Sequence, residues 1–249
     1  MVKGVSVKFR SYQDTIPQLL KLLKFDQEIK KHNRIVLKPH LLTGNPDLST
    51  KVEFIEAVLK FCTENKSPGT EVFIVEGADG PDTDSVFEDF GYRKLSEKYG
   101  IGLVDLNKAE TETVLNGEFL RFEEISYPKI LMNSFLISLP PLNAHEELGI
   151  SASLDTMIGA YPASKYRGFF SRTKNKIRRW PIKYSVHDIL KVKMPDFSII
   201  DASNHGYILA GKPIDMDKQG AKMLGLDWRN LSHLKMIDES FAPKPEVKE

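Results

Sequence analysis

The stretch RIVLKPHLLTG, residues 34–44, reads as a buried strand that ends in polar side chains. Ile35, Val36 and Leu37 form a short apolar run, and Lys38 and His40 follow it almost at once. A short apolar run bounded by a turn signal is typical of a buried strand. Ligands of open parallel sheets bind beyond the carboxyl ends of the strands, so this stretch predicts both a central strand and a site at its end.

Extended and helical patterns alternate on both sides of this strand. The N-terminal pattern alternates apolar and polar residues, which predicts a half-buried strand. Thr50 and Glu53 have the spacing of a capping box at a helix start, and Pro17 suits the first turn of an earlier helix. Up to residue 106, strands are predicted at 5–9, 34–38, 71–76 and 102–106, with helices at 16–31 and 51–65 and two short helices within 84–100. This alternation predicts a parallel sheet with helices on its faces.

The pattern changes after residue 106. The segment TVLNGEFLRF predicts two strands around a turn at Asn116-Gly117. Further strands are predicted at 134–139, 196–201 and 206–211, and helices at 185–193, 215–224 and 228–238. We therefore predict an α/β fold with a mostly parallel or mixed central sheet, helices on both faces and a β-hairpin insertion at about 111–127. We expect one domain over residues 1–243 and a frayed tail at 244–249.

Composition and charge exclude several classes of protein. The 249 residues carry a formal net charge of +1, so no global field recruits nucleic acid or membrane. The most apolar region spans 13 residues, 130–142, whereas a membrane span needs about 20. One cysteine, Cys62, argues against a disulfide or an iron–sulfur cluster and is predicted to be a buried, inert thiol. We expect a cytoplasmic protein without a membrane partner, and no pattern identifies a cofactor or an oligomeric state.

Polar side chains follow four of the predicted strands. Their types suit anion binding, proton transfer or metal coordination. The candidate residues at these strand ends are Lys38, His40, Glu76, Asn143, His145 and Asp201. Because parallel strands end at one edge of a sheet, we predict that Lys38, His145 and Asp201 converge, although a structural role for any one of them is the simpler alternative.

The acidic stretch EGADGPDTD, residues 76–84, lacks the spacing of a calcium loop, so we predict a solvated loop with a helix N-cap. The dinucleotide fingerprint, the P-loop and the zinc-protease motif are also absent from the sequence. No motif therefore assigns a reaction.

A basic segment at 165–183 interrupts the second half of the chain, within a predicted loop or lid at about 160–183. It contains eight basic residues and no acidic one, with aromatic residues interleaved. Such a segment could bind nucleic acid, close over the pocket as a lid, or form a solvated loop whose aromatics pack on the core. For the lid, the candidate ligand-binding residues are Lys165, Arg178 and Arg179.

Several segments together resemble the domain-of-unknown-function family 362 (DUF362). The resemblance covers about residues 30–240 and rests on VLKPHLL, STKVEFIEAVLKF, VEGADG, FEDFGYRKLSEKYGIGLVDLN, KMPDFSIIDA and GYILAGKPIDMDKQGAKMLGLD. It implies the α/β fold and adds Asp217, which matches a family aspartate, as a ligand-binding candidate. This chain departs from the family's usual lysines near Asn143 and Asp155, and it lacks the ferredoxin-like cysteine motifs that several members carry.

The leading hypothesis is a binder or enzyme of a small anionic metabolite. Lys38 would pair with a carboxylate or phosphate, and one of His40 and His145 would be a general base. Asp201 would orient that base or hold a metal, whose identity the sequence leaves unknown. The alternatives are a nucleic-acid-binding module that uses the basic segment and a non-catalytic scaffold with a degenerate site.

Overall fold

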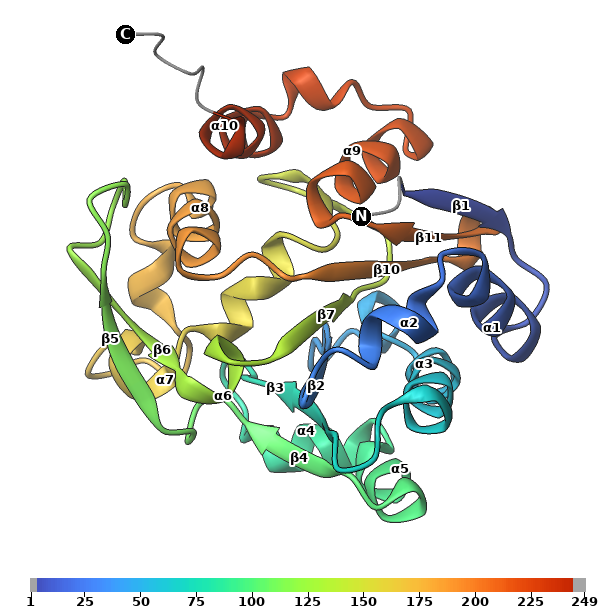
Figure 1. Ribbon diagram of the computed structural model, residues 1–249. Helices are drawn as coiled ribbons and strands as arrows, with labels where there is room; N and C mark the ends of the chain where they lie inside the picture. The colour runs from blue at the N-terminus through green and yellow to red at the C-terminus, as the bar shows by residue number, and fades with distance from the viewer. Residues whose placement is uncertain (1–3, 244–249) are drawn as a thin grey trace, which may run out of the picture.

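A seven-stranded mixed sheet forms the centre of the protein (Figure 1). The computed structural model describes residues 4–243. In spatial order the strands are β1 (Val5–Lys8), β11 (Tyr207–Gly211), β10 (Phe197–Ala202), β7 (Phe135–Leu139), β2 (Arg34–Pro39), β3 (Glu71–Glu76) and β4 (Gly102–Asp105). The five strands from β10 to β4 pair in parallel, and β11 is antiparallel to both of its neighbours. The predicted α/β class with a mixed central sheet is confirmed.

Helices cover both faces of the sheet, as predicted (Figure 1). One face packs against α1 (Tyr12–Leu22), α2 (Phe25–Ile29), α3 (Val52–Asn65), α4 (Thr83–Asp89) and α5 (Tyr92–Tyr99). The other packs against α6 (Lys129–Met132), α7 (Ala163–Tyr166), α8 (Ile182–Val192), α9 (Pro213–Met223) and α10 (Ser232–Phe241). Among the described residues, no helix is long and apolar enough to cross a membrane.

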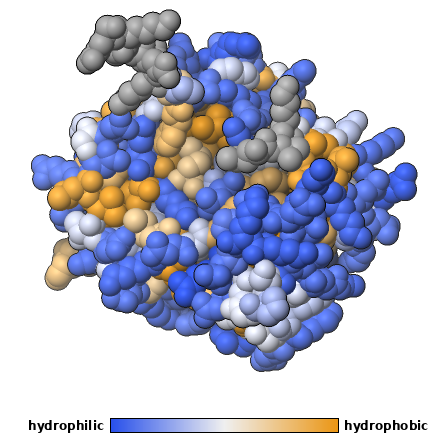
Figure 2. All heavy atoms as spheres, viewed as in Figure 1, coloured by the Kyte–Doolittle hydropathy of each residue, from blue (hydrophilic) through white to orange (hydrophobic). Residues whose placement is uncertain are grey.

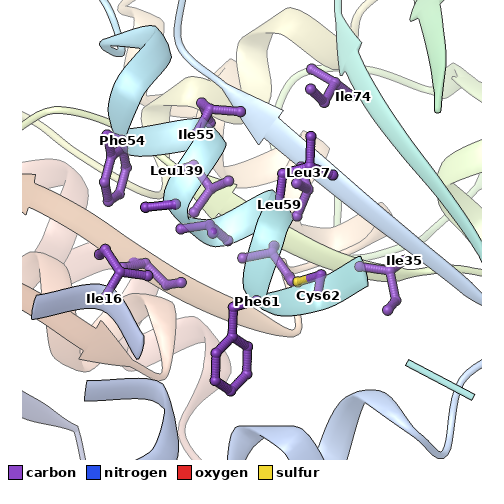
Figure 3. Packing of buried hydrophobic residues seen from close by; sticks show 14 of the residues in the cluster. Ile16, Ile35, Leu37, Phe54, Ile55, Leu59, Phe61, Cys62, Ile74 and Leu139 are labelled. Atoms are coloured by element: carbon purple, nitrogen blue, oxygen red, sulfur yellow. The ribbon is translucent and has the colours of Figure 1, made fainter. Parts of the chain in front are cut away.

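The apolar run of β2 supplies both hydrophobic cores. Ile35 and Leu37 face α3, where they pack with Leu59 and Cys62, as Figure 3 shows. Val36 points the opposite way into the second core. Successive side chains of a strand alternate between its faces, so a strand covered on both sides must be apolar throughout. The predicted burial of Cys62 is confirmed, and burial raises the pKa of its thiol to about 12.

The order of the strands creates a crevice between β2 and β7. The chain runs from β2 to β3 and β4 in one direction and then continues on the other side of β2 with β7 and β10. Loops that follow two such strands diverge, and ligands of open α/β sheets bind at this switch point.

The predicted capping box at Thr50 is wrong, because its hydroxyl is used elsewhere. The helix α3 begins at Val52 without a side-chain cap. Thr50 Oγ1 instead accepts the backbone N–H of His40 at 2.8 Å and donates to the carbonyl of Leu139 at 2.7 Å. These two bonds tie the carboxyl ends of β2 and β7 together beside the crevice.

The first predicted helix is also different, because residues 16–31 form parts of two helices. The Ser11 hydroxyl accepts the N–H of Asp14, so α1 begins at Tyr12 and Pro17 lies inside it rather than in its first turn. Lys24 has a left-handed φ of 53° and separates α1 from α2.

The hairpin insertion is present, but its predicted tight turn is wrong. The strands β5 (Thr111–Leu115) and β6 (Glu124–Pro128) pair antiparallel, with Leu115 opposite Glu124. Residues 116–123 form a loop rather than a second strand. The buried carboxylate of Asp188 on α8 accepts the backbone N–H groups of Leu120, Arg121 and Phe122, so this loop bonds to a helix instead of a strand.

Several short elements complete the fold. A small hairpin of β8 (Asn143–His145) and β9 (Gly149–Ser151) follows β7. A 3-10 helix, η2 (Asp155–Ala160), comes next. The predicted frayed tail at 244–249 lies outside the described residues, and the assignment of one domain to 1–243 stays a prediction.

Candidate functional site

A cavity of about 250 Å³ lies at the carboxyl ends of β2, β3 and β7, where the sequence predicted a site. Its wall combines residues 40–43 after β2, residues 76–79 after β3, residues 143–145 after β7 and parts of 151–159. The basic segment contributes Lys174 and Arg178. Five stretches distant in sequence therefore meet at the switch point of the sheet.

A buried ion pair forms the floor of this cavity. Lys38 is fully buried and donates from Nζ to Glu76 Oε1 at 3.0 Å and to the carbonyl of Pro39 at 3.2 Å. Lys38 does not line the cavity, and its direct pairing with a ligand anion stays a prediction. A buried ammonium needs a nearby counter-charge, and Glu76 provides it.

Glu76 lines the cavity, and one of its two carboxylate oxygens has no partner among the described residues. Its Oε1 accepts from Lys38 and from the N–H of Gly77 at 2.8 Å. Its Oε2 is buried and has no hydrogen-bond partner among the described residues. A buried acceptor without a donor is costly, so a hydroxyl or amino group brought by a ligand would stabilise this oxygen.

Two glycines let the backbone cover the ion pair closely. A Cβ at Gly159 would lie 2.5 Å from Glu76 Oε1 and 2.7 Å from Lys38 Nζ. A Cβ at Gly77 would lie 2.3 Å from the carbonyl oxygen of Gly159. The η2 segment therefore packs directly on the ion pair because neither position carries a side chain.

The two cavity histidines differ in the bonds of their rings. Nδ1 of His145 receives the backbone N–H groups of Glu147 and Leu148, both at 3.1 Å. An N–H group can only donate, so Nδ1 is unprotonated and Nε2 carries the ring proton. His145 can therefore donate to a ligand, but it is not a free base in this arrangement.

His40 is the better candidate for a proton acceptor. Burial lowers its pKa, so the imidazole is neutral near pH 7, while the charges of Asp155 and Glu76 act in the opposite direction. No described residue hydrogen-bonds to its ring, and the residue lines the cavity. A neutral imidazole without a protein partner is available to take a proton from a ligand.

Lys174 is a site residue that the sequence did not single out from the basic segment. It is fully buried and donates from Nζ to the carbonyls of Gly77 at 2.7 Å and Gly159 at 3.1 Å. Burial lowers its pKa to about 8. Its backbone N–H also bonds to Asp79 Oδ1 at 2.6 Å, so Lys174 anchors the basic segment over the loop after β3.

Arg178 is the exposed cation at the cavity. Its guanidinium donates to Asp79 Oδ2 at 2.5 Å, and about half of its side chain is exposed. The predicted partners Lys165, on α7, and Arg179 are exposed and do not line the cavity. The basic segment therefore supplies one accessible guanidinium to the wall.

Asp155 is a second residue that the sequence did not identify as a site residue. Its carboxylate accepts the Ser151 hydroxyl at 2.6 Å and the Ala152 N–H at 2.7 Å, and it lines the cavity. It begins an irregular segment, where no strand-end argument applies. Asn143 also lines the cavity as predicted, with Nδ2 donating to the Leu48 carbonyl at 3.1 Å.

His145 lines the cavity, whereas Lys38 and Asp201 do not, so the convergence of these three residues at one site stays a prediction. Asp201 accepts the Tyr12 hydroxyl at 2.6 Å and the Ser203 N–H at 2.9 Å. Burial and the bond to Asp201 raise the pKa of Tyr12. Each oxygen of Asp201 therefore has a partner within the protein, and its predicted role of orienting a histidine or holding a metal stays a prediction.

Asp217 supports the wall of the cavity from behind. It is buried on α9 and accepts the backbone N–H groups of Ser153 at 2.8 Å and Leu154 at 3.0 Å. Burial raises its pKa to about 7. The family aspartate therefore positions the 151–159 stretch, and its predicted contact with a ligand stays a prediction.

The acidic stretch contains the predicted helix N-cap, but it is not solvated throughout, because residues 76–78 are buried. Asp82 caps α4 by accepting the N–H groups of Asp84 and Ser85. The carboxylates of Asp82, Asp84 and Asp105 form a group with metal-ligand spacing, but the Lys108 ammonium lies 2.8, 2.9 and 3.3 Å from them. A lysine thus occupies the position that a cation would take.

The protein is an open α/β fold with a polar cavity at the switch point of its sheet. The chain belongs to the family described as domain of unknown function DUF362, whose model matches residues 35–221. This confirms the resemblance noted in the sequence. A curated relative, the thylakoid-associated protein sll1697 of Synechocystis sp., is 25% identical over 212 residues, which cover 81% of this chain and 63% of the relative.

Proposed function

We propose that the cavity binds a small carboxylate or phosphate metabolite that also carries a hydroxyl or amino group. The observation that carries this proposal is that one cavity is lined both by Arg178, whose guanidinium is exposed, and by Glu76, whose buried Oε2 has no partner among the described residues. A guanidinium favours a planar or tetrahedral anion, and the carboxylate oxygen needs a donor. A ligand with both groups satisfies both side chains at once.

The balance of charges around the cavity supports directional recognition rather than attraction of any anion. Two basic and three acidic side chains line the cavity, namely Lys174, Arg178, Glu76, Asp79 and Asp155, and Lys38 lies behind the wall, paired with Glu76. Since the formal charges cancel, specificity must come from individual hydrogen bonds. The Nε2–H group of His145 supplies a further donor for the anionic end.

A reaction at this site would use His40 as its base. The neutral ring faces the cavity without a protein partner, so a proton from the ligand can move to it. We propose proton transfer as the chemistry of the site in that case. We also propose a cytoplasmic setting, because the one thiol, Cys62, is buried and the chain needs no oxidising compartment.

Titration calorimetry with matched pairs of small anions tests the binding proposal. Glycerate and glycerol phosphate carry the hydroxyl that Glu76 requires, whereas acetate and methyl phosphate lack it. We expect the hydroxylated anions to bind at least about 10-fold more tightly, because a hydrogen bond to a charged group contributes about 1.5 kcal/mol or more. Equal affinity within each pair would contradict the role of Glu76.

Arg178→Gln tests the anion contact separately. We expect affinity to fall about 10- to 100-fold, as for the loss of one charge-assisted bond. Lys165→Gln is the matched control, since it removes an exposed cation of the same segment that does not line the cavity. If the two variants bind equally well, or no anion binds the native protein, the proposal fails.

A further inference from the structure

Two adjacent phenylalanines project from the basic segment into solvent. Phe169 is 96% exposed and Phe170 is 98% exposed. Their rings contact only each other among the described aromatic residues, edge to face, with centroids 5.0 Å apart. The expectation that the aromatics of this segment pack on the core is correct for Tyr166 and wrong for this pair. We call residues Phe169 and Phe170 the aromatic tip.

The loop that carries the aromatic tip is held in shape at its base. Asn175 Oδ1 accepts the backbone N–H of Gly168 at 2.7 Å, and Ser171 N–H donates to the carbonyl of Gly168 at 3.0 Å. A Cβ at Gly168 would lie 2.9 Å from the Asn175 side chain. The buried Lys174 fixes the segment to the rest of the molecule. A small turn thus presents two apolar rings that contribute nothing to the hydrophobic cores.

Basic side chains surround the aromatic tip in sequence. Arg167 and Arg172 flank it and are exposed, as are Lys165 and Arg179 further along. No acidic residue occurs from 165 to 183. Exposed apolar rings within a basic rim are the combination that inserts into the interfacial region of an anionic bilayer.

We propose that the aromatic tip docks the protein on the surface of a membrane that contains anionic lipid. The rings would enter the headgroup and acyl boundary, and Arg167 and Arg172 would contact phosphate groups. The proposal is independent of the ligand in the cavity, because neither ring nor either arginine lines it. It also replaces the sequence-based expectation that no membrane takes part.

Nucleic acid fits these observations less well. The eight basic residues of 165–183 and the total of +1 leave the rest of the chain with a formal charge of −7, which repels an extended polyanion. The two rings also cover one another edge to face, so they are not spaced to stack on successive bases.

Sedimentation of the full chain with vesicles tests the proposal. We expect binding to vesicles of phosphatidylcholine mixed with phosphatidylglycerol, and much weaker binding to phosphatidylcholine alone. The double substitution Phe169→Ser and Phe170→Ser should weaken binding at least about 100-fold, because each ring contributes apolar burial of about 1.5 kcal/mol or more. Arg167→Gln with Arg172→Gln should weaken it about 10-fold or more at low salt, since each cation near the surface contributes about 1 kcal/mol.

Leu22→Ser is the matched control for the phenylalanines, because Leu22 is a 61% exposed apolar residue on α1. It should leave vesicle binding unchanged. Equal loss of vesicle binding in this control, or no binding to anionic vesicles by the native chain, would overturn the proposal.

The same variants are titrated with a labelled single-stranded RNA. Tip-dependent binding to RNA without binding to vesicles would replace the membrane with nucleic acid and overturn it as well.

Discussion

A single methyl group at Gly159 would collide with the buried ion pair. The Cβ of an alanine there would lie 2.5 Å from Glu76 Oε1 and 2.7 Å from Lys38 Nζ. We expect Gly159→Ala to lower the free energy of unfolding by about 1–3 kcal/mol, as for other overpacked sites. Gly117→Ala is the control, since nothing lies within 4 Å of a Cβ there. Urea denaturation measures both, and equal stability of the two variants would contradict the close packing on the pair.

The raised pKa of Asp217 predicts a particular dependence of stability on pH. Its pKa is about 7 in the folded protein and about 3.9 in an unfolded chain. The folded state therefore binds the extra proton between these values, so this residue's contribution is complete below about pH 4 and is lost as the pH rises through about 7.

Asp217→Asn removes this titration. We expect the variant to show a smaller loss of unfolding free energy between about pH 4 and pH 7 than the native protein. Asp47→Asn, at an exposed position, should keep the native slope. Denaturation curves at several pH values give the comparison, and a slope in Asp217→Asn as steep as in the native protein would exclude the carboxyl as its source.

The position of a residue after a predicted strand indicated where it lies in the fold better than it indicated what the residue does. Lys38, His40, Glu76, Asn143 and His145 follow predicted strands, and the structure brings four of them to the cavity wall and Lys38 to its floor. The partners could not be predicted, because Lys38 and Glu76 are paired only once β2 and β3 lie side by side. Asp155 and Lys174 were missed since they come from irregular segments, where neither periodicity nor a strand end marks them.

At the level of elements, the hairpin loop at 116–123 depends on one distant carboxylate. Asp188 accepts three consecutive backbone N–H groups from Leu120 to Phe122 and also bonds to His187 at 2.8 Å. The turn signal Asn116-Gly117 is local, whereas this acceptor lies about 70 residues away on α8. The local signal therefore predicted the presence of a hairpin but the wrong turn.

Removing that carboxylate should release the loop. We expect Asp188→Ala to lower the free energy of unfolding by about 2–3 kcal/mol, because buried donors lose a charged acceptor. Amide exchange at Leu120, Arg121 and Phe122 should become faster than in the native protein. Glu123→Gln changes an exposed acid of the same loop and should leave exchange unchanged. If these three amides exchange as slowly in Asp188→Ala as in the native protein, Asp188 does not hold the loop in place.

At the level of the whole molecule, the order of the strands in the sheet determines where the cavity forms. The local pattern of apolar and polar residues does not predict that order. Composition and alternation predicted the strands up to β4 as neighbours in a parallel sheet. The first strand lies at the far edge instead, paired with β11 from the end of the chain. Placing β7 against β2 sets the switch point, which requires contacts across 100 residues that no short motif encodes.

Thr50 is the residue that links the two sides of this switch point, so it should act on binding as well as stability. In Thr50→Val the N–H of His40 and the carbonyl of Leu139 lose their shared partner, although the side chain keeps its shape. We expect a loss of about 1–3 kcal/mol in unfolding free energy, because two buried polar groups become unpaired. Thr50→Ser keeps the hydroxyl and should preserve most of the stability.

The loops after β2 and β7 carry His40 and His145, so affinity for a cavity ligand should also fall in Thr50→Val and recover in Thr50→Ser. Calorimetry with glycerate or glycerol phosphate and denaturation in urea provide both readings. A Thr50→Val protein that binds as tightly as Thr50→Ser would show that the tie between β2 and β7 does not position the site.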